Sequence, residues 1–203
     1  MTAQRNPILD LSLIAVFAAL IVAFTQVPAV PVPGNAVPIT LQTLAVALTA
    51  MIIGPWRAAA ATTLYLVLGF AGLPVFAQGS SSLAVLSKAS AGYLLSFPLY
   101  AIIVGLLAQW VVRRLRRGRV PGLIAAGLVG SFLVVHPLGI LGMAANIPTS
   151  LGKAFGFDMV FWPGDVIKTV VAALVAVAVH KAFPTLMRRT QVVEAQPAGG
   201  TLD

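Results

Sequence analysis

The chain has 203 residues, of which 59% are hydrophobic and only 9% are charged. A soluble domain carries roughly 25% charged residues, so this composition excludes an ordinary water-facing surface and favours one that faces lipid. The net charge of +8 does not indicate a nucleic-acid partner, because most basic residues lie at the ends of apolar runs, and five are arginines between Arg113 and Arg119. The absence of cysteine excludes disulfides and thiolate metal sites.

Six apolar segments follow along the chain, and each is a candidate membrane-spanning helix, which needs about 20 residues. They cover residues 8–27, 39–54, 58–71, 89–112, 120–145 and 160–183. The second and third are short, so we expect them to be tilted, extended into loops or shielded by protein. The first exceeds the apolar region of a signal peptide, about 7–15 residues, and is expected to be retained.

The distribution of basic residues predicts the orientation. With the N-terminus inside, ten basic residues face the cytoplasm and two, Lys88 and Lys153, face outward. The prediction is an all-α integral membrane protein with six transmembrane helices and both termini in the cytoplasm. Residues 1–189 form the membrane domain, and the polar tail 190–203 is expected to be disordered. The Pro-rich stretch 28–38 is either a disordered linker or, as its apolar residues favour, a loop folded onto the bundle, of which a lid over a binding cavity is one form.

The last segment carries two opposite charges three residues apart. Asp165 and Lys168 share a helix face, and ionisable residues within a membrane are costly and usually face the interior. One interpretation is an ion pair that satisfies itself, or a lysine that reaches to the interface. The other is a ligand clamp for a ureido ring or another heterocyclic amide, because a carboxylate accepts N–H groups and an ammonium donates to a carbonyl.

Further polar candidates lie at the outer helix ends. Thr40 either caps the second helix or faces a ligand, and Gln42 offers an amide to a cavity. Tyr93 either anchors the fourth helix at the interface or presents its ring to a flat ligand. Lys88 fits a solvated flank, and Asn146 has weak support as a cavity residue.

Two other features have simple structural explanations. Ala15, Ala19 and Ala23 are spaced by four, which permits close approach of another helix, although an alanine-rich chain also gives this spacing by chance. His136 precedes Pro137, and we interpret it as part of a proline kink.

The chain contains no phosphate-binding loop of the form GxxxxGK[ST], and no HExxH or GxSxG motif. Between Leu11 and Arg188 the only acidic residues are Asp158 and Asp165. We therefore expect a protein that recognises a ligand and is not an enzyme. It is not expected to hydrolyse ATP or to use a metal or a cofactor.

The strings PVPGNAVPITLQTLAV, GLPVFA, AGYL and FWPGDVIKTVVAALVA, in this order, make the chain resemble the BioY family, the substrate-binding (S) components of energy-coupling-factor (ECF) biotin transporters. The resemblance implies biotin as the ligand, bound by Asp165 and Lys168 and, through the AGYL motif, Tyr93. It also implies a transmembrane coupling subunit, contacted by Ala15 and Ala19, and two ABC-type ATPase subunits. SKASAGY and QGSSS replace the usual GPTGGY-like and Gly/Asn-rich runs, which leaves the contacts from residues 79–91 open.

Three rival functions remain at this stage. Two of them are a binding subunit for another vitamin, such as thiamine or riboflavin, and a self-sufficient biotin carrier. A membrane enzyme is disfavoured by the missing catalytic motifs.

Overall fold

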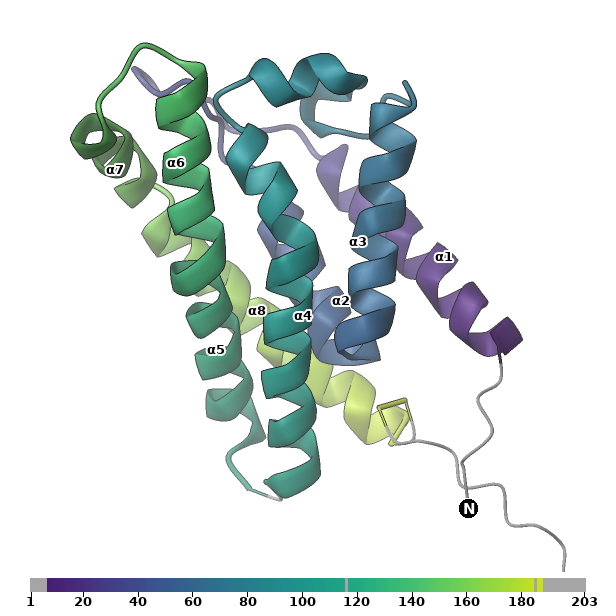
Figure 1. The fold of residues 1–203 in the computed structure, drawn as a ribbon. Coiled ribbons are helices and arrows are strands. Elements are labelled where there is room, and N and C mark those ends of the chain that lie inside the picture. Colours follow the sequence, from purple (N-terminus) through teal and green to yellow (C-terminus); the bar gives the residue numbers. More distant parts are fainter. Residues whose placement is uncertain (1–6, 116, 185, 188–203) are drawn as a thin grey trace, which may run out of the picture.

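The computed structural model describes residues 7–115, 117–184 and 186–187, and this part of the chain is a bundle of helices (Figure 1). The α-helices are α1 (Pro7–Thr25), α2 (Gln42–Ile53), α3 (Pro55–Phe70), α4 (Ala91–Arg114), α5 (Arg119–Gly130), α6 (His136–Asn146), α7 (Leu151–Met159) and α8 (Trp162–Ala182). Two short 3₁₀ helices, η1 (Ala77–Gly79) and η2 (Leu83–Ser87), lie between α3 and α4. The predicted all-α class is confirmed, and the predicted tail 190–203 lies outside the described residues.

Helices lie in all six predicted segments. Among the described residues, four helical stretches are long and apolar enough to cross a membrane: α1 with 19 residues, α4 with 24, the continuous stretch Arg119–Asn146 with 28, and α8 with 21. The helix α2 has 12 residues and α3 has 16. Every residue of α2 from Ala45 to Ile53 is buried, so this short helix is shielded by its neighbours, as the sequence allowed.

A sharp turn joins α2 to α3. Gly54 has φ +83°, which disfavours a side chain, and Pro55 suits the first turn of α3, where its missing N–H has no partner to lose. The neighbouring α4 approaches this turn closely, because a Cβ added at Gly105 would lie 2.5 Å from the Cα of Pro55. Glycine at 105 therefore permits the central helix α4 to pack against α2 and α3.

The fifth segment is one long helix with an irregular middle. A π-helical turn, η3 (Ser131–Val135), joins α5 to α6, and the backbone N–H of His136 bonds to the carbonyl of Ser131 five residues back. Pro137 follows directly and has no N–H to donate. The expected irregularity at this proline is thus present, and such turns are frequent at functional sites.

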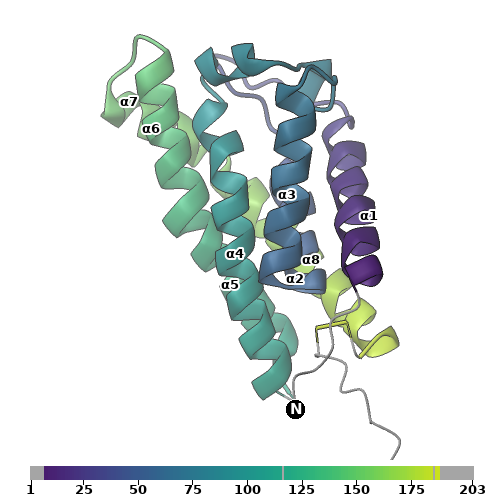
Figure 2. The same cartoon turned by 45° about the vertical axis from the view of Figure 1, so that its right-hand side comes forward.

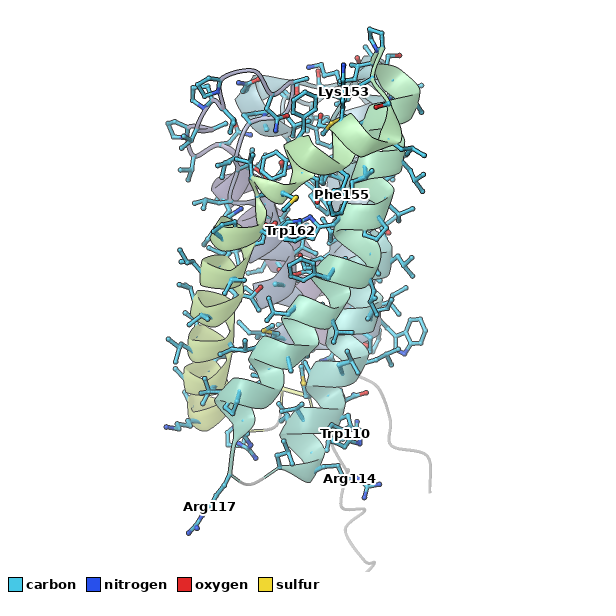
Figure 3. The ribbon with its side chains drawn as sticks, turned by 90° about the vertical axis from the view of Figure 1, so that its left-hand side faces the viewer. Trp110, Arg114, Arg117, Lys153, Phe155 and Trp162 are labelled. Carbon is cyan, nitrogen blue, oxygen red and sulfur yellow. The ribbon has the colours of Figure 1, made fainter. Side chains whose placement is uncertain are left out.

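The bundle has two unlike ends (Figures 1 and 2). The start of α1, the turn between α4 and α5 and the end of α8 lie together at one end. The loop 26–41, the segment 71–90 and α7 lie at the other. Figure 3 places Arg114 and Arg117 at the first end and Lys153 at the second. We call these the arginine end and the cavity end.

The helix α7 was not predicted from the sequence. Ser150 caps it by accepting a hydrogen bond from the backbone N–H of Lys153 at 3.3 Å. Ala154 and Asp158, one turn apart, are its two fully buried residues. A helix of nine residues with a single buried stripe gives little apolar signal, and it leads directly into α8.

Candidate ligand-binding site

A cavity of about 310 Å³ lies at the cavity end of the bundle. This volume lies within the range of small-molecule sites, about 300–1,000 Å³. Its wall combines the loop 36–43, the segment 76–90 and the first turns of α4 and α8. All five predicted ligand-binding residues line it, namely Thr40, Gln42, Tyr93, Asp165 and Lys168. The structure therefore brings together side chains from four separate parts of the sequence.

One group of polar side chains in the cavity wall consists of Thr43, Asp165 and Lys168. We call this group the cavity cluster. Lys168 Nζ donates to Asp165 Oδ1 at 2.9 Å and to Thr43 Oγ1 at 3.3 Å. Thr43 in turn donates to Asp165 Oδ1 at 2.9 Å. Asp165 is 5% exposed. The pair is thus an internal ion pair and part of the cavity wall at once, so the two interpretations of these charges are compatible in this geometry.

Thr43 was not among the predicted binding residues. It lies in the first turn of α2, directly after Gln42, and its position next to a predicted binding residue was the available signal. Its partner Asp165 lies 122 residues further along the chain. Sequence spacing alone does not reveal such a contact.

A second carboxylate lies behind the cavity, in a group that we call the buried cluster: Tyr93, His136, Asp158 and Trp162. Asp158 is fully buried. Its Oδ1 accepts from the Tyr93 hydroxyl at 2.7 Å and lies 2.9 Å from His136 Nδ1, and its Oδ2 accepts from Trp162 Nε1 at 2.8 Å. Three polar groups from α4, α6 and α8 therefore converge on one carboxylate of α7, which satisfies a charge that would otherwise be costly to bury.

His136 connects the two clusters. Its Nε2 lies 3.3 Å from Ser131 Oγ and 3.6 Å from Asp165 Oδ2. The interpretation of His136 as a companion of the Pro137 kink was incomplete, because the imidazole is 3% exposed and faces both buried carboxylates. A lone histidine beside a proline gave no sign of this role.

Tyr93 contributes its ring rather than its hydroxyl to the cavity. The hydroxyl is bonded to Asp158, and the ring packs edge-to-face against Phe161 with centroids 5.9 Å apart. Both aromatic side chains line the cavity. They form an apolar wall beside the cavity cluster, which suits a ring-shaped ligand.

Thr40 and Gln42 form a separate chain of hydrogen bonds. Thr40 donates to Gln42 Oε1 at 3.0 Å, and Gln42 Nε2 donates to the buried hydroxyl of Tyr65 at 2.7 Å. Thr40 combines the two alternatives given for it: Leu41 occupies the N-cap of α2, but Thr40 Oγ1 accepts from the backbone N–H of Gln42 at 3.5 Å, and the residue also lines the cavity. The Gln42 amide is oriented by Tyr65, which the sequence did not indicate.

The loop over the cavity is held in place. Val30 and Ile39 exchange two backbone hydrogen bonds of 2.9 Å, and Asn35 Nδ2 donates to the Phe157 carbonyl at 2.9 Å. The expectation that this stretch folds onto the bundle is confirmed. Asn146 does not line the cavity. Its amide instead donates to the carbonyls of Leu86 and Lys88, at 2.7 and 2.9 Å.

The alanines of α1 lie on the opposite side of that helix from its core contacts. Ala15, Ala19 and Ala23 are exposed, whereas Ala18 and Ile21 are buried. A partner helix would find a smooth face here. In the described residues, no group of three His, Asp or Glu side chains is arranged to hold a metal ion.

The sequence model of the BioY family matches residues 1–185. The chain belongs to the BioY family. It is 39% identical over 190 residues to a protein named biotin transporter BioY from Rhodobacter capsulatus, covering 88% of this chain and 96% of that one. It is 37% identical over 182 residues to a biotin transporter BioY from Rhizobium etli, covering 89% and 97%. This BioY chain is therefore a transport protein of the membrane and not an enzyme.

The fold agrees with a solved member of the same class. A crystal structure described as the S-component for biotin from an ECF-type ABC transporter superimposes with a TM-score of 0.82. The match covers 88% of this BioY chain and 95% of that one, at 22% identity. This likeness shows the fold, and the predicted family is confirmed by the family match and the two relatives.

Proposed function

We propose that this chain captures biotin at the outer face of the bacterial plasma membrane, as the S component of an ECF transporter. The observation that carries the proposal is the cavity cluster, an acceptor and a donor side by side in the wall of a small-molecule cavity. Two relatives that this chain matches over nearly their whole length are named biotin transporters, which supports biotin over thiamine or riboflavin as the ligand.

The chemistry of the cavity matches a cyclic urea. The ureido ring of biotin has two N–H donors and one carbonyl acceptor, and Asp165 accepts while Lys168 donates. Asp165 Oδ1 is occupied by Thr43 and Lys168, whereas Oδ2 has a distant contact at 3.6 Å to His136. We assign Oδ2 to a ligand N–H. Tyr93 then covers one side of the ring system.

The orientation follows from charge. Arg114 and Arg117 lie at one end of the bundle and Lys153 at the other (Figure 3), and basic residues concentrate on the cytoplasmic side. With six spans and both termini inside, the cavity end faces the medium. Biotin then enters beneath the loop 26–41, which closes over it.

Release inside the cell needs energy from other subunits. The chain has no phosphate-binding loop, so we assign ATP hydrolysis to two ABC-type ATPase subunits. A transmembrane coupling subunit connects these ATPase subunits to this chain. The exposed alanine face of α1 at Ala15 and Ala19 is the proposed contact with that coupling subunit.

Isothermal titration of the detergent-solubilised protein with biotin tests the proposal. Asp165→Asn and Lys168→Ala should each weaken binding by more than tenfold, because losing one partner of a shielded charged contact costs about 2–5 kcal/mol. Lys181→Ala is the matched control, since Lys181 is exposed in the last turn of the same helix and lies outside the cavity. Unchanged affinity in both cavity variants, or binding of thiamine instead of biotin, would contradict the proposal.

A further inference from the structure

We propose that Lys88 binds a carboxylate of the ligand, so that the cavity recognises a singly charged anion whose neutral head group lies at the cavity cluster. The inference deepens the proposed function and rests on it for the identity of the head group. It assigns a second polar site to the cavity, at the opposite end of the ligand from Asp165 and Lys168.

The first argument is the charge of the cavity wall. Three residues that carry charge at neutral pH line it: Lys88, Asp165 and Lys168. Asp165 and Lys168 compensate each other at 2.9 Å, and the other nearby acid, Asp158, is fully buried among its own donors. Among the residues that line the cavity, the positive charge of Lys88 is therefore left without a balancing negative charge. A neutral ligand would leave this charge unmatched, whereas one carboxylate would balance it.

The second argument is the position of Lys88. In the described part of the chain, no carboxylate lies within ion-pair distance of its ammonium group, although the side chain contributes to the cavity wall. Lys88 is exposed, whereas the cavity cluster is nearly buried. The cationic group therefore lies at the mouth of the cavity, where the charged end of a ligand remains partly hydrated.

The third argument is that the backbone at Lys88 is fixed. Asn146 donates to the carbonyls of Leu86 and Lys88, and the Lys88 N–H bonds to the Val85 carbonyl at 3.1 Å. Val85 and Ala89 on either side are buried. The ammonium thus extends from an anchored base. Ser87 and Ser90 line the same part of the wall and offer hydroxyl donors to a carboxylate.

The experiment compares biotin with biotin methyl ester, which keeps the ring and the side chain but has no charge. Both ligands are titrated into the parent chain, Lys88→Ala, Lys88→Arg and Lys153→Ala. The parent should prefer biotin. Lys88→Ala should bind biotin about fivefold more weakly, the upper end for a solvent-exposed ion pair, and bind the ester as the parent does. Retained ester binding shows that the variant is folded.

The remaining variants distinguish the effect of a positive charge at position 88 from the effect of any positive charge at the cavity end. Lys88→Arg should keep the preference for biotin, and so should Lys153→Ala, because Lys153 is exposed at the same end but does not line the cavity. An undiminished preference for biotin in Lys88→Ala overturns the inference alone. A parent chain that binds neither ligand overturns the proposed function, and this inference with it.

Discussion

The two carboxylates on either side of His136 are held in different ways. Asp158 accepts hydrogen bonds through both oxygens, from groups on three other helices, and is fully buried. Asp165 concentrates its short contacts on Oδ1 and lines the cavity. A carboxylate satisfied on both oxygens by protein has little capacity left for a ligand. A carboxylate in a cavity wall with one oxygen that lacks a short hydrogen bond can still accept a hydrogen bond from a ligand.

This difference is the basis for the proposed division between a structural carboxylate and a ligand-binding carboxylate within a single network. The buried cluster joins α4, α6, α7 and α8 and fixes the Tyr93 ring. The cavity cluster joins α2 to α8, and in the proposed function it leaves Asp165 Oδ2 for a ligand N–H group. We therefore expect mutations in the buried cluster to lower stability and mutations in the cavity cluster to lower affinity.

The largest expected effect is that of Asp158→Ala. It would leave the Tyr93 hydroxyl, the Trp162 indole N–H and His136 without their shared acceptor, and breaking a buried charged contact costs about 3–5 kcal/mol of stability. Asp165→Ala should cost less, because Lys168 is partly exposed to the cavity, with 12% of its side chain accessible. Thermal unfolding in detergent without ligand measures both. An equal or larger loss for Asp165→Ala would break the comparison.

Tyr93→Phe should have a smaller effect of the same kind. The change removes the 2.7 Å hydrogen bond to Asp158 but keeps the ring on the cavity wall. A hydrogen bond to a charged group contributes about 1.5–3 kcal/mol, so the melting temperature should fall while biotin affinity changes by less than about threefold, under 1 kcal/mol. Strong loss of affinity with unchanged melting would show instead that the hydroxyl contacts the ligand.

The sequence predicted the elements with a strong local signal. Long apolar segments gave the helices, and Pro137 gave the irregular turn between α5 and α6. The spacing of Asp165 and Lys168 placed two charges on one helix face, and the structure has them 2.9 Å apart. Each of these inferences depends on residues within a few turns of one another, where helical geometry fixes which side chains meet.

The missed features depend on distant partners. Asp158 meets Tyr93 across 65 residues and His136 across 22, and only the short helix α7 brings it there. Asn146 was placed near the cavity but binds the segment that carries Lys88, because the end of α6 packs beside that turn. An amide at a helix end has many possible partners, and the sequence does not select among them.

Thr43→Val tests the boundary between the two clusters and should have the smallest effect. Valine keeps the shape but removes one donor to Asp165 and one acceptor for Lys168, although those two charges remain paired. Without Thr43, the Asp165 carboxylate loses one of the two groups that orient it, so biotin affinity should fall about fivefold, which corresponds to about 1 kcal/mol. The remaining ion pair between Asp165 and Lys168 should keep the change in melting temperature small. Thr63→Val, at an exposed position on α3 away from the cavity, is the control. If Thr43→Val lowers the melting temperature as much as Tyr93→Phe and leaves affinity intact, the cavity cluster is structural too, and the distinction between the two carboxylates fails.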